Sequence, residues 1–130
     1  MIGIDTNVLV RFLVADDPEQ SEAARALVLR ATPDAPLFVG TLVLAEVYWV
    51  LTRAMRYSPE TVIRMLAELI DVPELVFEHD RDARTLLSLM SAVDLADGLI
   101  AAAAIRAGCR RTVTFDRAAA RALPDMELLS

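Results

Sequence analysis

Ile2-Gly3-Ile4-Asp5-Thr6-Asn7-Val8-Leu9 opens the chain with three residues typical of a short buried strand, followed by an aspartate and the start of a helix. The same order returns near the C-terminus, where Arg111-Thr112-Val113-Thr114-Phe115 predicts a strand and Asp116 begins a short helix through Leu123. Strands that run directly into helices are typical of α/β folds, so these two stretches indicate the architecture of the whole chain.

The sequence between these two stretches alternates in the same way. We expect further strands at 37–39, 75–77 and 126–129, and helices at 8–13, 18–31, 42–55, 59–70, 81–89 and 94–107. Gly108 is expected to stop the last of these helices. The alternation predicts an α/β layer fold with a mainly parallel sheet. With 130 residues and no internal repeat or linker, residues 1–130 are expected to form a single domain.

The composition excludes several classes of protein. No apolar stretch is long enough to span a bilayer and the N-terminus lacks the pattern of a signal peptide, so a cytoplasmic protein with no membrane partner is expected. Cys109 is the single cysteine, expected to be a small core residue, and His79 is the single histidine, which argues against zinc chemistry.

The charged residues give a mixed indication of whether the protein binds nucleic acid. The net charge of −6 argues against a phosphate-binding surface, unless several of the acids share one pocket and hold cations. All 13 basic residues are arginines, which suit bidentate phosphate contacts. Candidates for such contacts are Arg11, Arg53, Arg81 and Arg117.

Asp5 and Asp116 occupy equivalent positions, each directly after a predicted strand. For either one alone, helix capping explains the residue well. Ligands collect at the carboxyl ends of parallel strands, however, and the two aspartates would lie side by side if their strands were neighbours in the sheet.

Two further acids stand out within apolar helices. Glu46 is the only charged residue between Thr41 and Leu51, and burying its carboxylate would be costly unless a cation or donor compensates it or its side chain reaches water. Asp94 and Asp97 are three residues apart at the start of a helix, which places both on one face. Capping explains Asp94, and interaction with the helix dipole is an alternative explanation of Asp97.

Four stretches resemble, in order and spacing, the acidic motifs of PIN domains, most closely those of VapC-type toxins of bacterial toxin–antitoxin pairs. The stretches are Ile4-Asp5-Thr6-Asn7-Val8-Leu9, Leu44-Ala45-Glu46-Val47, Asp94-Leu95-Ala96-Asp97-Gly98-Leu99-Ile100-Ala101-Ala102 and Thr114-Phe115-Asp116-Arg117. The resemblance covers nearly the whole chain, and four ordered motifs are far more specific than any single one.

The resemblance implies a site and a function. Asp5, Glu46, Asp97 and Asp116 correspond to the acidic quartet of the family, which implies that they are both catalytic and metal-binding. Accessory positions are Asp94, Thr6, Asn7 and Thr114. The resemblance also implies a three-layer α/β/α fold with a central sheet of about four to five strands, endoribonuclease activity on RNA, frequent homodimers and inhibition by a cognate antitoxin.

A site whose ligands are all oxygen atoms suits Mg²⁺ or Mn²⁺. Clustered carboxylates also need cations between them to offset their mutual repulsion. Such ions can activate water to attack a phosphodiester, so no protein nucleophile is required.

Several alternatives remain. A phosphoryl-accepting receiver domain or a haloacid-dehalogenase-like phosphatase would be expected to contain a lysine, and the phosphatase would need an aspartate where Asn7 stands. A non-catalytic module that holds a structural ion or an arginine-rich partner, and a structure-specific DNA nuclease, also stay open.

Overall fold

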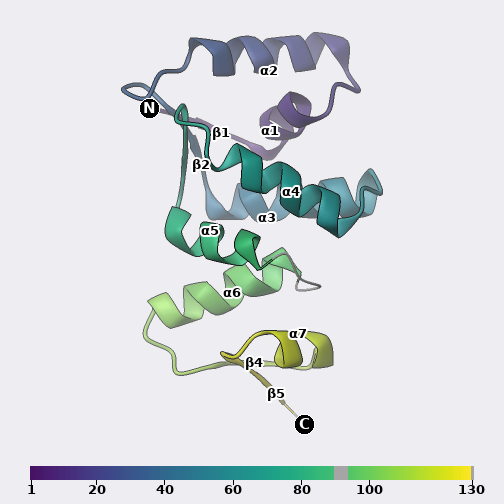
Figure 1. Cartoon of the computed structure of the whole chain (residues 1–130), viewed down its shortest axis with the longest axis vertical. Coiled ribbons are helices and arrows are strands. Elements are labelled where there is room, and N and C mark those ends of the chain that lie inside the picture. The colour runs from purple at the N-terminus through teal and green to yellow at the C-terminus, as the bar shows by residue number, and fades with distance from the viewer. Residues whose placement is uncertain (90–93, 130) are drawn as a thin grey trace.

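The computed structural model describes residues 1–89 and 94–129, in which short parallel strands alternate with helices (Figure 1). The strands are β1 (Ile2–Ile4), β2 (Leu37–Val39), β3 (Leu75–Phe77), β4 (Thr112–Thr114) and β5 (Met126–Leu128). The helices are α1 (Thr6–Leu13), α2 (Pro18–Arg30), α3 (Thr41–Trp49), α4 (Pro59–Leu69), α5 (Asp80–Ser88), α6 (Leu95–Arg106) and α7 (Arg117–Ala122). Each of these elements lies where the sequence predicts it. The helix expected at 42–55 differs in one respect, because α3 changes at Val50 into a π-helical turn, η1 (Val50–Ala54).

The helix ends follow local capping chemistry. Asp17 and Ser58 cap α2 and α4, each accepting a hydrogen bond from a backbone N–H of the first turn, and a proline follows each cap. Gly108 ends α6 in the left-handed conformation (φ 94°), as the sequence predicts. The N–H of Cys109 bonds to the Ala104 carbonyl beyond this turn, which leaves Cys109 exposed, so its expected place in the core is wrong.

The five strands form two parallel sheets. β1, β2 and β3 lie in that order in one sheet, with Ile2 paired to Leu37 and Leu37 to Leu75. β4 and β5 form the second sheet, in which Thr112 pairs with Met126. In Figure 1, β4, α7 and β5 lie at the end of the molecule opposite α2, on the far side of α6. β1 and β4 are therefore both edge strands.

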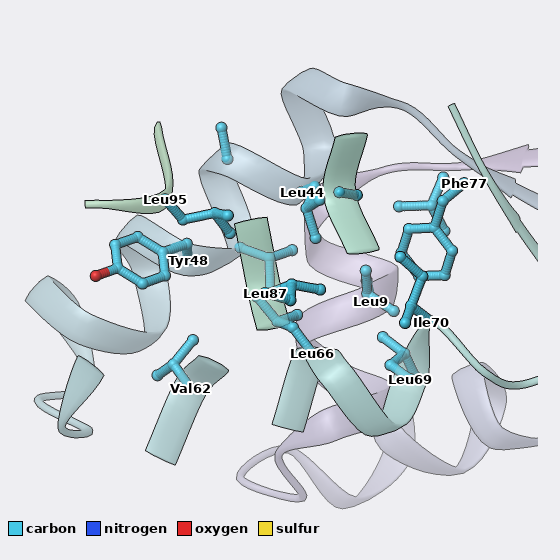
Figure 2. Close-up of a cluster of buried hydrophobic side chains, with 14 of the residues drawn as sticks. Leu9, Leu44, Tyr48, Val62, Leu66, Leu69, Ile70, Phe77, Leu87 and Leu95 are labelled. Carbon is cyan, nitrogen blue, oxygen red and sulfur yellow. The ribbon is translucent and has the colours of Figure 1, made fainter. Parts of the chain in front are cut away.

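One face of the three-stranded sheet carries the main core. Ile4, Val39 and Phe77 on this face are buried, together with leucines from the surrounding helices. Figure 2 shows Leu9, Leu44, Leu66 and Leu87, from four different helices, meeting within this cluster. The second sheet has a much smaller core of Ala101, Ala119, Leu123 and Met126.

The α/β class and the parallel strands are confirmed, but the arrangement differs from one central sheet of four to five strands with helices on both faces. Alternation along the strands turns Gly3 and Val76 to the opposite face of the three-stranded sheet, and both are exposed. The difference arises at β4, which pairs with β5 and, within residues 1–89 and 94–129, with no other strand. No helix in the described part of the chain is long and apolar enough to cross a membrane.

Candidate active site

Asp5 lies at the carboxyl end of β1, and the next residue, Thr6, contacts Glu46 of α3; we call Asp5 and Glu46 the first pair of acids. Asp5 Oδ1 accepts a hydrogen bond of 3.0 Å from the N–H of Val8 and so caps α1. Thr6 Oγ1 donates to Glu46 Oε1 at 3.1 Å, which joins the start of α1 to the middle of α3. Because the cap uses one oxygen of Asp5, its second oxygen is available to a cation.

Asp116 has the equivalent position at the carboxyl end of β4. Its Oδ1 accepts hydrogen bonds from the N–H groups of Ala118 and Ala119, at 2.9 and 3.1 Å, and caps α7. Thr114 Oγ1 accepts a 3.0 Å hydrogen bond from the N–H of Asp116 and fixes the turn between strand and helix. The capping explanation is thus correct for both aspartates, and both keep one carboxylate oxygen free of the cap.

Asp97 lies in a cluster of charges at the start of α6. Burial, followed by the carboxylates of Asp94 and Asp116, raises its pKa above the ordinary value, and Arg53 opposes this rise. Asp94 Oδ1 caps α6 through the N–H of Ala96 at 2.8 Å, and its Oδ2 lies 3.8 Å from Arg53 Nη2. Asp97 thus lies near enough to Asp94 and Asp116 for their charges to act on it, and we call Asp97 and Asp116 the second pair of acids.

Tyr48 of α3 lies near Asp94 and Asp97, the two acids at the start of α6. Its side chain is buried, and burial followed by the Asp94 carboxylate raises the pKa of its hydroxyl. Tyr48 is part of the main core.

Gly98 holds α6 close to α5. A Cβ at this position would lie 2.6 Å from Leu86 Cδ2, closer than two carbon atoms can approach without a shift. The absence of a side chain leaves room for Leu86 of α5 to pack directly against the first turn of α6, which carries Asp97. Packing between α3 and α6 then keeps Asp97 near Tyr48.

The four acids occur as two pairs in this structure. Among residues 1–89 and 94–129, no three His, Cys, Asp or Glu side chains are close enough together to hold one metal ion. The chemistry of the donors fits Mg²⁺ or Mn²⁺, since every candidate ligand is a carboxylate and both strand-end aspartates keep a free oxygen. β1 and β4 lie in different sheets, so strand pairing does not hold Asp5 and Asp116 side by side.

Glu46 is exposed rather than buried, so the argument from the cost of burying its charge does not apply. Its side chain reaches water, the alternative left open by the sequence. Asn7, the other accessory residue beside Asp5, is also exposed.

The arginines differ in what surrounds them. Arg11 is neutralised by Asp16, whose Oδ1 lies 2.8 Å from Arg11 Nη1. Arg53 lies 5.6 Å from the centre of the Trp49 ring, and its Nη2 lies 3.8 Å from Asp94 Oδ2, beside the acids at the start of α6. Arg81 and Arg117 are exposed.

Glu78 is an acid that sequence reasoning missed. It follows β3 directly, as Asp5 follows β1 and Asp116 follows β4, and its Oε1 accepts a 2.9 Å hydrogen bond from the N–H of Thr41 at the start of α3. This hydrogen bond lowers the pKa of Glu78. The dipeptide Phe77-Glu78 repeats the pattern of an apolar strand followed by an acid, and that repetition could have identified it.

Comparison with known proteins identifies the family of this chain. No curated protein matches the sequence closely enough to count as a relative. The PIN domain family, in contrast, matches residues 2–122, nearly the whole chain. The matched range contains the four acids and the polar residues beside them. The chain therefore belongs to the PIN domain family, whose members are generally nucleases.

Proposed function

We propose that this protein is a divalent-metal-dependent endoribonuclease and the toxin of a VapBC-type toxin–antitoxin pair. The observation that carries the proposal is the repeated placement of acids at strand ends. Asp5 follows β1, with Glu46 linked to it through Thr6, and Asp116 follows β4, with Asp97 near enough to feel its charge. Membership of a family of nuclease-type modules supports the same conclusion.

The proposal requires the two pairs of acids to come together, and the free strand edges provide a route. The N–H of Ile2 bonds to the Pro36 carbonyl, so the N–H of Gly3 points away from β2. The N–H of Thr112 bonds to the Asp125 carbonyl, so the N–H of Val113 points away from β5. If β4 added to β1 in parallel, both edges would be satisfied and Asp5 and Asp116 would lie at the same end of one sheet.

The residues of this chain would then place the ions and the substrate. Asp5 and Asp116 are fixed by the caps of α1 and α7, Glu46 by Thr6, and Asp97 by the contact of α6 with α5. Bound divalent ions would supply activation of the attacking water and offset the charge of the phosphodiester. The caps and hydrogen bonds limit the conformational freedom of these carboxylates before ions bind.

RNA is the proposed substrate because the acidic motifs resemble those of VapC-type toxins most closely. A structure-specific DNA nuclease is the alternative, and a comparison of substrates tests it. We also propose that the antitoxin inhibits the enzyme by placing an arginine-bearing segment against the acids. Guanidinium groups pair bidentately with carboxylates, and the net charge of −6 favours a basic partner.

A homodimer is part of the proposal, and the groove between α3 and α6 is its candidate contact surface. This groove has a volume of about 550 Å³ and includes Trp49 and Ile100, whose side chains are 38% and 53% exposed. Apolar side chains gathered at a surface groove are typical of protein contact sites.

The test is cleavage of structured and single-stranded RNA with Mg²⁺, with Mn²⁺ and with a chelator. We expect cleavage by the wild type only with a divalent ion, and losses of several orders of magnitude for Asp5→Ala and Asp97→Ala, because the acids act as one unit. Glu22→Ala, which removes an exposed acid from α2, is the control and should cleave normally. Cleavage that survives the chelator or the Asp97 substitution would rule out the mechanism.

Two further measurements separate the alternatives. Calorimetric titration of Mn²⁺ should show binding that Asp5→Asn and Asp97→Asn together remove. Metal binding without cleavage of any RNA or DNA would indicate the non-catalytic module. Cleavage of flap or single-stranded DNA in preference to RNA would indicate the DNA nuclease.

A further inference from the structure

A pocket of about 360 Å³ lies between α1 and α2, directly beside Asp5. These two helices lie next to each other at the N-terminal end of the molecule (Figure 1). The volume is at the lower end of the range for small-ligand sites, which suits a single heterocyclic ring system. We call it the α1–α2 pocket, and the catalytic proposal above gives it no role.

One wall of the α1–α2 pocket is apolar. Ala23, Ala24 and Leu27 of α2 form it, and the two alanines carry no side chain beyond Cβ that would fill the space. A planar ring can lie against such a wall and bury its apolar face. Charged ligands gain nothing from this surface.

The rim of the pocket provides hydrogen-bond donors without net positive charge. Arg11 Nη1 bonds to Asp16 Oδ1 and Arg11 Nε bonds to Gln20 Oε1, both at 2.8 Å. Within residues 1–89 and 94–129, no hydrogen bond uses Arg11 Nη2, and Gln20 keeps its amide NH₂ because its oxygen already accepts from Arg11. Asp16 neutralises the guanidinium, so the rim suits a neutral ligand with acceptor atoms better than a phosphate.

We propose that the α1–α2 pocket binds a guanine base of the RNA substrate, next to the phosphodiester that is cut. Guanine offers two neighbouring acceptors, O6 and N7, to arginine and amide donors, whereas adenine offers one acceptor and one donor at the same edge. Asp5 borders the pocket, so a base held there lies next to the acidic site. This inference rests on the proposed ribonuclease function and adds a sequence preference to it.

The test begins with binding that requires neither metal nor cleavage. Guanosine, adenosine, cytidine and uridine are titrated separately in the presence of a chelator, while the backbone amide signals of the protein are followed by NMR. We expect guanosine to shift the amides of Ala23 and Ala24 in a saturable way, with an affinity at least about fivefold higher than that of the other nucleosides.

Two variants and a matched control test the position of the pocket. Ala23→Leu adds a side chain to the pocket wall and should abolish guanosine binding, while Glu22→Leu adds the same side chain at the neighbouring exposed position outside this pocket and should not. Gln20→Ala removes a donor from the rim and should reduce the preference for guanosine. Circular dichroism checks the fold of each variant, and Gln20→Ala carries the test if Ala23→Leu does not fold.

The outcomes distinguish a failure of this inference from a failure of the proposed function. Equal binding of all four nucleosides, or an unchanged guanosine response in Ala23→Leu, overturns the inference. Metal-dependent RNA cleavage with the same sequence preference in wild type and Gln20→Ala overturns it while leaving the ribonuclease intact. Guanosine binding by a protein that cleaves no RNA overturns the proposed function and, with it, the role of the pocket in substrate choice.

Discussion

Val113→Pro should weaken the pairing of β4 with β1 if the two edge strands pair in solution. The N–H of Val113 points away from β5, so a proline at this position leaves the hydrogen bonds between β4 and β5 intact. The proline would lack the donor that β1 needs, and its ring would face the β1 edge. The substitution is therefore harmless to the two separate sheets and harmful to a joined sheet.

The size of the effect follows from the exposed edge residues. Ile2 is 59% exposed and Val113 is 50% exposed. Covering about half of each aliphatic side chain gains about 1 kcal/mol per residue. Two new ladder hydrogen bonds add about 1 kcal/mol each, and ordering the joined edge costs about 1 kcal/mol. The net of about 3 kcal/mol corresponds to roughly 150-fold protection of the Gly3 amide from hydrogen exchange.

Hydrogen exchange of the Gly3 amide, measured by NMR, is the assay. Val113→Pro removes one hydrogen bond and the valine contact, about 2 kcal/mol, so protection should fall about 30-fold. Leu128→Pro is the matched control, since the N–H of Leu128 points away from β4 at the outer edge of the same sheet. If Gly3 exchanges equally fast in the wild type and in Val113→Pro, β4 does not pair with β1 and the proposed assembly of the acids is wrong.

Four further predictions concern the acids and the packing around them. Mn²⁺ at about 100 times its dissociation constant should stabilise the wild type by about 2.7 kcal/mol in thermal unfolding, and Asp97→Asn should remove most of this gain. Without metal, the raised pKa of Asp97 means that its carboxylate destabilises the folded state as pH rises through the window from its ordinary pKa to the raised one. Asp97→Asn should therefore increase the free energy of unfolding at neutral pH, with the difference vanishing below the ordinary pKa of aspartate; a decrease at pH 7 would contradict the sign. Light scattering should show a dimer at high micromolar concentration, which Ile100→Glu should convert to a monomer; a monomeric wild type would refute the dimer. Gly98→Val should destabilise the protein by about 1–3 kcal/mol in urea unfolding through its clash with Leu86, and Leu86→Ala should recover part of that loss.

The local structure was predictable because short-range chemistry decides it. Strand–helix turns carry an aspartate that caps the helix, and such caps depend only on residues two to four positions apart. The role of Gly108 is predictable for the same reason, because the left-handed turn that ends α6 favours glycine. The exposure of Cys109 follows from that turn and could not be predicted from the residue type, because cysteine is more often buried.

Glu46 shows how an apolar sequence can mislead about burial. Leu42, Glu46, Trp49 and Arg53 recur at helical spacing, and all four are exposed. Because Leu42 and Trp49 are large and apolar, the sequence of α3 and η1 indicates a helix that is buried on every side. The stripe is instead exposed, and its two apolar residues, Leu42 and Trp49, line the groove between α3 and α6.

The gathering of the acids depends on strand order, which no local pattern determines. The sequence identified Asp5 and Asp116 as equivalent because each follows an apolar strand, and that equivalence is correct. Whether they meet depends on whether β1 and β4, more than a hundred residues apart, are neighbours. The free energy that would join β1 and β4 comes from burying a few exposed side chains and from two or three hydrogen bonds at each edge. When the edges are open, water forms hydrogen bonds with the same backbone groups, so the net gain is small. The small free-energy difference between joined and separate sheets depends on the whole chain and not on the motifs. The motifs therefore identify the acids, whereas the joining of the acids into one site is a proposal.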